Sequence, residues 1–245
     1  MIKIYTDLVQ GSDEWLQARC GLLTASEMRL IMAPKPEQET RIKKNGEPYK
    51  QREWKVFSES DECCRHLYEL LGQRITKYVE SSYVSDAMLR GQADEVEARI
   101  LYSEKYSAVS EIGFMTNDFG IGVTIGYSPD GLVGEDGLIE CKSRKQAYQV
   151  ETRLKRTVPR EFMLQIQTGL LVSCRKWLDF ISYCGGLDMI TMRVYPDRET
   201  QDAILDAATQ FEERLQKNLK IYDSPGGVEM RLIPTKRRIE HEMFI

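Results

Sequence analysis

The sequence that decides the fold is YSPDGLVGEDGLIECK, residues 127–142. Two four-residue turn sequences, SPDG and GEDG, bracket a short apolar run, and a second apolar run follows them. This arrangement predicts a β-hairpin. Because side chains alternate along a strand, Glu140 and Lys142 are expected on one face and Cys141 on the other. Burying a carboxylate and an ammonium in an otherwise apolar strand costs free energy, so these groups are expected to be paired or to serve a function.

The regions on either side of this hairpin have the periodicities of further strands and helices. Strands are expected at residues 109–115, 121–127, 132–142, 177–184 and 189–195. Helices are expected at about residues 13–20, 25–32, 53–72, 86–106, 160–174 and 198–220. Helices that flank a meandering sheet indicate an α+β or mixed α/β fold, and no break in composition divides residues 1–245 into more than one domain.

Local patterns refine three of these segments. Thr24 and Glu27 have the spacing of a capping box at the start of a short helix. Residues 33–52 are proline-rich and polar, which predicts a mobile or DNA-contacting loop. The apolar stripe expected on helix 53–72 consists of Trp54, Phe57, Cys64, Tyr68 and Leu71. On helix 86–106 the apolar positions are Met88, Ala93, Val96, Ile100 and Leu101.

The composition excludes several classes of protein. The net charge of −4 differs from that of a simple basic nucleic-acid-binding domain. No apolar run approaches the roughly 18–20 residues of a membrane-spanning helix, and the N-terminal residues lack the apolar core of a signal peptide. Six cysteines without a C-x-x-C pair indicate reduced thiols in a cytosol. Two histidines are too few for a three-histidine zinc site.

Asp130 adds a second carboxylate to the hairpin, in the turn that opens it. Two carboxylates near a lysine form a place for a hard divalent ion such as Mg²⁺, which prefers oxygen ligands and keeps several waters. Lys142 could then orient or help deprotonate a water on the ion, or stabilise the charge of a pentacovalent phosphate. The same spacing also fits an ordinary Pro-Asp-Gly turn and a solvated Glu-x-Lys ion pair, so the chemistry needs further support.

An ordered set of five motifs supplies that support. The motifs are Glu14-Trp15-x-x-x-Arg19-x-Gly21-x-x-Thr24-Ala25-Ser26, Gly91-x-x-x-Glu95, Ser128-Pro129-Asp130-Gly131, Glu140-x-Lys142 and Gln165-x-Gln167. In this order, and over about residues 11–180, the chain resembles the phage lambda exonuclease and YqaJ-type viral recombinase family of PD-(D/E)XK nucleases. The resemblance implies a single domain with a restriction-endonuclease-like core, in which helices flank a central mixed β-sheet.

The resemblance also implies roles for the residues at the hairpin. Asp130, Glu140 and the main-chain carbonyl of Cys141 would hold Mg²⁺, with Mn²⁺ as an alternative ion. Lys142 would be the catalytic lysine. Glu95 matches the family's helical glutamate, which supports the metal site and its water.

Four further residues match the family outside the hairpin strand. Gln165 resembles the helical glutamine near the active site, and Arg19, Ser26 and Ser128 match residues that grip a 5′-phosphate. A serine in the first turn of a capped helix and an arginine fork both suit an anion. Taken singly, Ser26 is also an ordinary capping serine and Arg19 an ordinary surface arginine stacked on Trp15.

The activity that the resemblance implies is metal-dependent 5′-to-3′ degradation of linear double-stranded DNA. It would release 5′-mononucleotides and leave a 3′ single-stranded overhang. The resemblance further implies a homotrimeric ring around DNA, a single-strand annealing protein as partner, and a phage or prophage protein in the cytoplasm of a bacterial host. We expect no zinc and, without a C-x-x-C spacing, no iron–sulfur cluster. A restriction-type endonuclease and a DNA-binding recombination scaffold remain as alternatives.

The net charge hides an uneven distribution. Residues 142–160 contain seven basic side chains and one acidic, and residues 41–55 contain six basic and two acidic. Stretches of this kind can follow phosphates without reading bases, although each is also compatible with a solvated loop. The acidic total therefore does not exclude DNA as a substrate.

Overall fold

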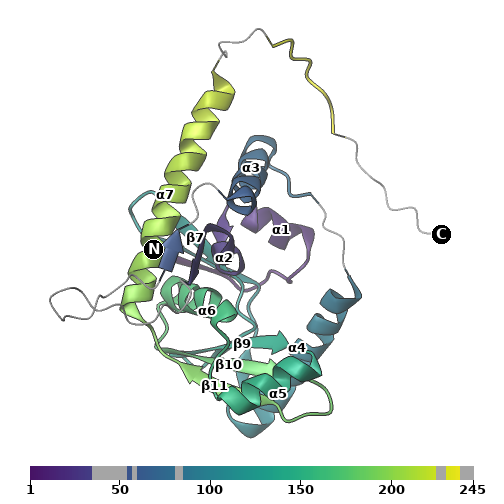
Figure 1. Cartoon of the computed structure of the whole chain (residues 1–245). Coiled ribbons are helices and arrows are strands. Elements are labelled where there is room, and N and C mark those ends of the chain that lie inside the picture. The colour runs from purple at the N-terminus through teal and green to yellow at the C-terminus, as the bar shows by residue number, and fades with distance from the viewer. Residues whose placement is uncertain (35–53, 57–59, 81–84, 225–229, 238–245) are drawn as a thin grey trace, which may run out of the picture.

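A computed structural model of the chain describes residues 1–34, 54–56, 60–80, 85–224 and 230–237. In this part of the chain the strands form a four-stranded sheet, a five-stranded sheet and a two-stranded ribbon, with helices packed around them (Figure 1). No helix among these residues is long and apolar enough to cross a membrane.

Both larger sheets are mixed. The four-stranded sheet has the order β1 (Ile2–Tyr5), β6 (Phe114–Asp118), β7 (Thr124–Tyr127) and β2 (Leu23–Thr24), and only β2 and β7 run parallel. The five-stranded sheet has the order β11 (Ile190–Val194), β10 (Trp177–Tyr183), β9 (Gly137–Ser143), β8 (Gly131–Val133) and β5 (Val109–Ser110). In it only β9 and β10 are parallel. The prediction of a mixed sheet flanked by helices is confirmed, and its strands divide between two sheets that meet where β7 leads into β8.

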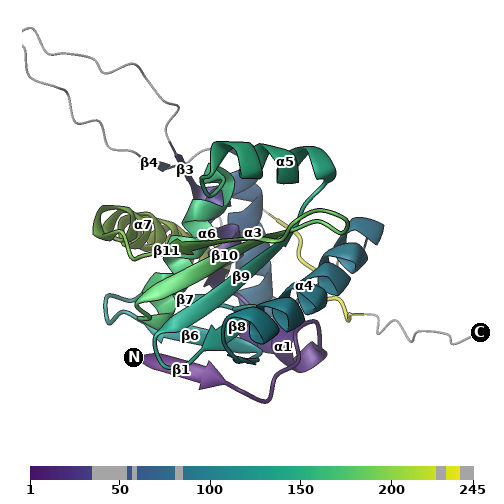
Figure 2. The same ribbon diagram turned by 90° about the horizontal axis from the view of Figure 1, so that it is seen from below.

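The helices lie on both faces of the five-stranded sheet (Figure 2). They are α1 (Asp13–Arg19), a 3₁₀ turn η1 (Ala25–Glu27), α2 (Met28–Ile31), α3 (Asp61–Thr76), α4 (Asp86–Lys105), α5 (Gln146–Lys155), α6 (Arg160–Ser173) and α7 (Arg198–Asp223). Helix α4 packs on β9 and β10 from one side, and α5 and α6 contact β10 from the other. Helix α7 packs on α3 and α6, and its far end extends beyond the body of the molecule (Figure 1).

The alternation expected in β9 is what the core shows. Ile139 and Cys141 pack against Ala98 and Tyr102 of α4 in a small cluster. Leu138 belongs instead to the larger core between the sheets and helices α3, α6 and α7. The strand is therefore buried on both faces, which matches its nearly continuous apolar sequence.

The expected helix at 53–72 is wrong at its start. Residues Trp54–Val56 form β4, which pairs antiparallel with β3 (Met32–Pro34). Ser60 then caps α3 by accepting from the backbone N–H of Cys63. The stripe was also misplaced, because α3 buries Cys63, His66, Leu67, Leu70 and Leu71, while Tyr68 is largely exposed. Phe57 lies outside the described residues.

Three other expectations need correction or stay open. Helix α5 was not anticipated within the basic segment 142–160. On α4 the buried positions are Ala98 and Tyr102, whereas Met88, Val96 and Ile100 are exposed. The first two residues of the loop expected at 33–52 belong instead to β3, and the rest of the segment lies outside the described residues.

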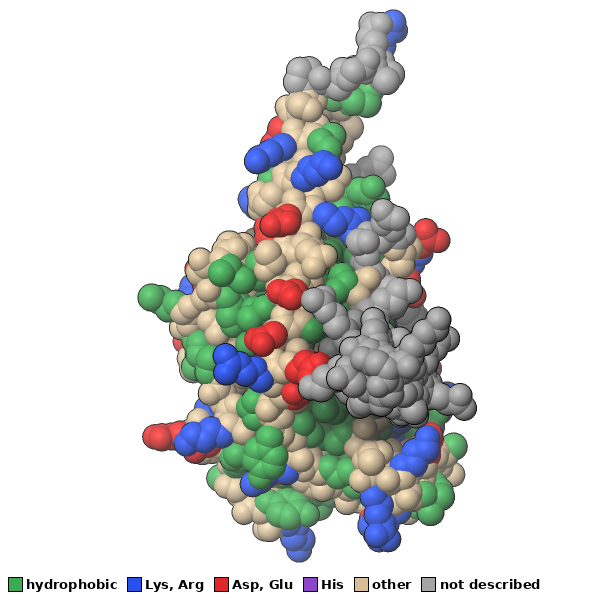
Figure 3. Space-filling view, turned by 60° about the vertical axis from the view of Figure 1, so that its left-hand side comes forward, with side chains coloured by type: hydrophobic (Ala, Val, Ile, Leu, Met, Phe, Trp, Pro, Cys, Tyr) green, Lys and Arg blue, Asp and Glu red, His purple; other side chains and the backbone are tan. Residues whose placement is uncertain are grey.

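Charged side chains of both signs are interspersed over the face along which α7 runs (Figure 3). Lys and Arg gather toward the projecting end of the molecule in this view, and Asp and Glu lie further down (Figure 3). The mixture agrees with a net charge close to zero for a chain of this size.

Candidate active site

The junction between the two sheets brings Asp130 to the middle of β9. Its carboxylate accepts a hydrogen bond from the backbone N–H of Cys141, with a distance of 2.5 Å between Oδ2 and N. The segment Ser128–Asp130 makes this approach because it leaves β7 in one sheet and enters β8 in the other. The two acids expected to converge therefore do so on adjacent strands.

Glu140 is the most deeply enclosed acid of the site, with 1% of its surface exposed. Oε2 accepts a hydrogen bond from the buried hydroxyl of Tyr127 at 2.8 Å. Oε1 accepts one from Nζ of Lys142 at 2.6 Å and another from the side-chain amide of Gln165. Because all three donors come from different elements, they fix both oxygens of this carboxylate in place.

Helix α4 supplies the third acid, Glu95. Its carboxylate lies 3.5 Å from the Arg99 guanidinium, which also donates to the main-chain carbonyl of Asp130 at 3.3 Å. One turn of α4 is fixed to the end of β9, because the Ser143 hydroxyl donates to Asp94 at 2.5 Å. Arg99 thus contacts both a residue of its own helix and the segment that carries Asp130.

A cleft of about 510 Å³ opens at these groups. Glu95, Arg99 and Asp130 line one part of it, and residues 6–10 and 111–113 line the rest. Two of the acids, Glu95 and Asp130, are therefore reachable from solvent through this cleft.

The site carries an excess of negative charge in a setting with little water. Burial raises the pKa of Asp130 well above its ordinary range, and the charges of Glu140 and Glu95 raise it further. Burial likewise raises the pKa of Glu95, with Arg99 opposing the shift. Burial alone would lower the pKa of Lys142, but the carboxylates of Glu140 and Asp130 outweigh it and hold the pKa above its usual value. The ammonium therefore stays charged.

These residues fit a divalent cation. Within the part of the chain that the structure describes, no three His, Cys, Asp or Glu side chains are close enough to form a complete metal cluster. Two carboxylates and a main-chain carbonyl with water in the remaining positions are, however, a ligand set that Mg²⁺ accepts. The mutual repulsion of the buried carboxylates is the kind of strain that a bound cation relieves. Asp130, Glu140 and the carbonyl of Cys141 are the groups that could hold it.

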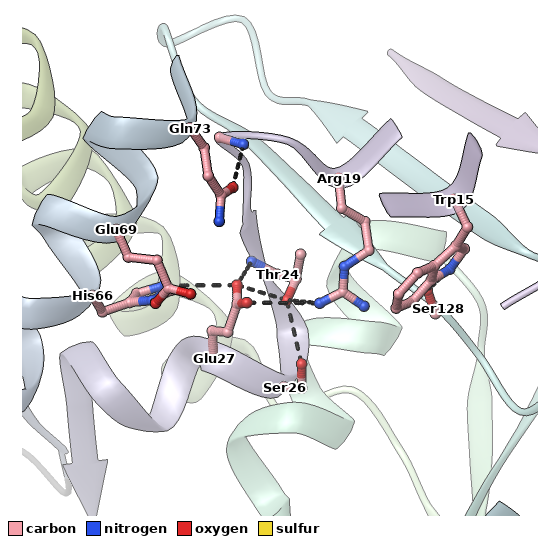
Figure 4. A network of polar contacts seen from close by, with 10 residues as sticks. Trp15, Arg19, Thr24, Ser26, Glu27, His66, Glu69, Gln73 and Ser128 are labelled. Carbon is pink, nitrogen blue, oxygen red and sulfur yellow. Dashed lines mark hydrogen bonds and ion pairs between the residues drawn. The ribbon is translucent and has the colours of Figure 1, made fainter. Parts of the chain in front are cut away.

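A second cluster of polar groups adjoins the carboxylates. The Arg19 guanidinium stacks on the Trp15 ring, 4.2 Å from its centroid. The Trp15 indole N–H donates to the Ser128 hydroxyl and to the carbonyl of Gly113, both at 3.0 Å. Figure 4 shows Arg19, Trp15 and Ser128 side by side, and Ser128 lies two residues before Asp130. The indole thus connects two of the three residues expected to grip a phosphate.

Ser26 belongs to the same cluster through the predicted capping box, which is present. Thr24 accepts from Arg19 at 3.1 Å and lies 3.3 Å from the exposed Ser26 hydroxyl. The Glu27 carboxylate accepts from both the backbone N–H and the hydroxyl of Thr24. Arg19, Ser26 and Ser128 are consequently linked in one network through Thr24 and Trp15 (Figure 4).

Three contributors to the site were not identified in the sequence. Tyr127 precedes the SPDG turn, and only the folded arrangement shows that its hydroxyl reaches Glu140. Gly169 of α6 leaves room for that ring, since a Cβ there would lie 2.6 Å from Cζ of Tyr127. Arg99 follows Glu95 by one helical turn, and this i to i+4 spacing was the one available indication of their contact.

Comparisons with known proteins agree on one family. The sequence model of the YqaJ-like viral recombinase domain matches residues 14–176. An alkaline exonuclease from Laribacter hongkongensis, LHK-Exo, superimposes with a TM-score of 0.69 and 26% identity, over 86% of this chain and 96% of that one. The same enzyme in complex with dAMP gives a TM-score of 0.69 and 27% identity over the same shares. No protein among the curated ones searched matches the sequence.

Proposed function

The chain belongs to the YqaJ-like viral recombinase family, and on that premise we propose that it is a metal-dependent exonuclease acting on the ends of linear double-stranded DNA. The proposed direction is 5′ to 3′, with release of 5′-mononucleotides and a 3′ single-stranded overhang as the remaining product. The likeness to an alkaline exonuclease at 26% identity over most of both chains supports the nuclease part of this proposal.

The observation that carries the proposal is the position of the cluster of Arg19, Ser26 and Ser128 beside the carboxylates of Asp130 and Glu140. We call this cluster the phosphate grip. Trp15 stacks on Arg19 and donates to Ser128, and Ser128 is two residues before Asp130, so the phosphate grip is connected to the carboxylates through the segment 128–130. An enzyme that hydrolyses the bond next to a terminal phosphate needs this pairing, because the terminus must be held while the next phosphodiester reaches the acids.

The proposed metal is Mg²⁺, with Mn²⁺ as an alternative, and neither zinc nor an iron–sulfur cluster is part of the proposal. Bound at Asp130, Glu140 and the carbonyl of Cys141, the ion would supply Lewis-acid stabilisation of the phosphoryl charge. Glu140 is held for that task by Tyr127 and Gln165. Tyr127 stays protonated, since burial and the Glu140 charge raise its pKa far above the ordinary value.

Lys142 has a role that follows from its charge. Its pKa is held above the usual value by Glu140 and Asp130, so the resting ammonium is a donor and not a base. It would orient the attacking water and stabilise negative charge that develops on the phosphate. Glu95 is the acid of raised pKa on the open side of the site, where it would accept a proton or hold the water.

The wider assignment rests on the family. We propose a phage or prophage recombination role in a bacterial cytoplasm, a homotrimeric ring around DNA, and a single-strand annealing protein as the partner that receives the overhang. LHK-Exo has been solved in complex with dAMP, and we propose mononucleotides as the product class of this chain.

A digest tests the proposed function directly. Linear duplex with 5′-phosphate ends and covalently closed circles of the same sequence are incubated with the full chain and Mg²⁺. We expect the linear duplex to be converted into mononucleotides, with a 5′-terminal label released before a 3′-terminal one, while the circles persist. Cutting of the circles would identify an endonuclease, and survival of both substrates would point to a DNA-binding scaffold.

A further inference from the structure

A carboxylate lies directly behind the phosphate grip. Oε2 of Glu27 accepts from the backbone N–H of Thr24 at 2.9 Å and from its hydroxyl at 2.8 Å, while Oε1 lies 3.6 Å from Nη2 of Arg19. Burial lowers the pKa of Arg19 and the charge of Glu27 partly restores it. Glu27 therefore forms an ion pair with the guanidinium and places a negative charge beside the residue proposed to bind an anion.

A buried histidine approaches the same carboxylate from the opposite side. His66 of α3 is 3% exposed, and its Nε2 lies 3.7 Å from Oε2 of Glu27. Among the described residues none forms a hydrogen bond with this nitrogen. Figure 4 shows Glu27 between His66 on one side and Thr24 and Arg19 on the other. A proton on Nε2 of His66 would point at the Glu27 carboxylate, which also forms the ion pair with Arg19.

The surroundings of His66 contain two carboxylates. Glu27 faces it from η1, and Glu69 of its own helix lies 3.3 Å from Nδ1 but is mostly exposed to solvent. Helix α7 contributes the Phe211 ring, which stacks on the imidazole with a centroid distance of 5.8 Å. Arg214 of the same helix is directed at the thiols of Cys63 and Cys64 on α3. Both charged groups in contact with His66 among the described residues are thus carboxylates.

We infer that His66 is a positioning residue whose proton neutralises Glu27, so that the phosphate grip holds a 5′-phosphate more tightly when His66 is charged. The inference rests on the proposed function, since it takes Arg19 as the group that binds the terminal phosphate. Histidine is the side chain whose charge changes between about pH 5 and 8. The preference for phosphorylated ends should accordingly weaken as the pH rises through that range.

The measured quantity is the ratio of kcat/KM for linear duplex with 5′-phosphate ends to kcat/KM for the same duplex with 5′-hydroxyl ends. Effects of pH on the chemical step are common to both substrates and cancel in this ratio. The ratio is determined between about pH 6 and 8.5 for the wild-type full chain and for His66→Gln, Glu27→Gln and Glu69→Gln. Glu27→Gln preserves an amide oxygen that can accept from Thr24, so the capping box survives.

The terminal phosphate itself ionises near pH 6, but this contributes equally to all four proteins. Results are therefore expressed relative to Glu27→Gln at each pH. We expect the wild-type preference to fall about fivefold relative to Glu27→Gln over this range, as for one charge several ångströms from the phosphate in a partly solvated site. For His66→Gln, the preference relative to Glu27→Gln should stay, at every pH, at the low level that the wild type reaches at the highest pH. Glu69→Gln should still lose its preference as the pH rises, because its carboxylate contacts His66 but not Arg19.

Each outcome decides something. A wild-type preference that stays constant relative to Glu27→Gln, or a His66→Gln variant that keeps the wild-type slope, overturns the inference. Melting curves report whether each variant folds, and if His66→Gln does not, the comparison of wild type with Glu27→Gln still decides. Failure of the proposed function looks different, because then linear duplex is not digested at all, or is digested without any preference for phosphorylated ends at any pH.

Discussion

Replacing Tyr127 by Phe removes a single hydrogen bond at the centre of the proposed active site. The Tyr127 hydroxyl is fully buried and donates to Oε2 of Glu140 at 2.8 Å. The substitution leaves the ring and its packing in place, so the loss is confined to one donor on a carboxylate. Hydrogen bonds to charged groups contribute about 1.5–3 kcal/mol. If that amount is lost from the positioning of Glu140, kcat falls about 10- to 150-fold.

The chain contains a matched control in Tyr102. This tyrosine is equally buried, and its hydroxyl donates at 2.6 Å to Asp179, a buried carboxylate that also receives two hydrogen bonds from Arg193. Tyr102→Phe should therefore lower the free energy of unfolding by about the same 1.5–3 kcal/mol as Tyr127→Phe, yet leave kcat near the wild-type value.

The assay is initial-rate release of nucleotides from 5′-phosphorylated linear duplex at saturating Mg²⁺, together with chemical denaturation of both variants. The reasoning is refuted if Tyr127→Phe keeps kcat within about twofold of wild type while losing stability as expected. Equal losses of kcat in both variants would show that activity follows general stability instead of the position of Glu140.

Three further predictions concern the surroundings of the site and the fold. Gly169→Ala puts a Cβ 2.6 Å from the Tyr127 ring and should lower kcat together with about 1–3 kcal/mol of stability, measured by the same two assays. Arg99→Gln removes a contact to the main chain at Asp130 and should weaken activity about tenfold, chiefly by raising the Mg²⁺ concentration required, which a metal titration checks. Burial opposes ionisation of Glu212, but hydrogen bonds from α3 and α7 prevail and lower its pKa. A depressed folded pKa contributes stability that is fully present above the unfolded value of about 4.3 and is lost as the pH falls through the lower folded pKa. Glu212→Gln should therefore be less stable than wild type at pH 7, and the difference should shrink as the pH falls below about 4.3, measured by denaturation across this range.

The part of the site that sequence could predict is the part set by local rules. Alternation along one strand places Glu140 and Lys142 on the same face, and a turn of four residues brings Asp130 to the adjacent strand. The capping box at Thr24 likewise depends on a spacing of three residues. Such features require only neighbouring positions, so a pattern in the sequence contains them.

Most of the features that were not predicted from the sequence depend on contacts between residues far apart in the chain. Residues 54–56 pair with 32–34 as strands, and this partner is chosen by tertiary structure and not by the periodicity that favoured a helix. The reach of Tyr127 to Glu140 and the position of His66 behind Glu27 both depend on how separate elements pack. Helix α5 was missed because the residues that it buries, Gln149 and Thr152, are polar and give no apolar stripe.

The most direct test of the central claim is the Mg²⁺-dependent release of mononucleotides from 5′-phosphorylated linear duplex by Asp130→Ala, compared with the wild-type chain at equal concentration. Asp130 is hydrogen-bonded to the backbone of β9, and its carboxylate is one of the two proposed to hold the ion. If the metal site is where the structure brings these acids together, the rate falls by at least about 100-fold while a melting curve shows a folded protein. Undiminished release by Asp130→Ala would contradict the account, because the nuclease activity would then have to come from another part of the chain.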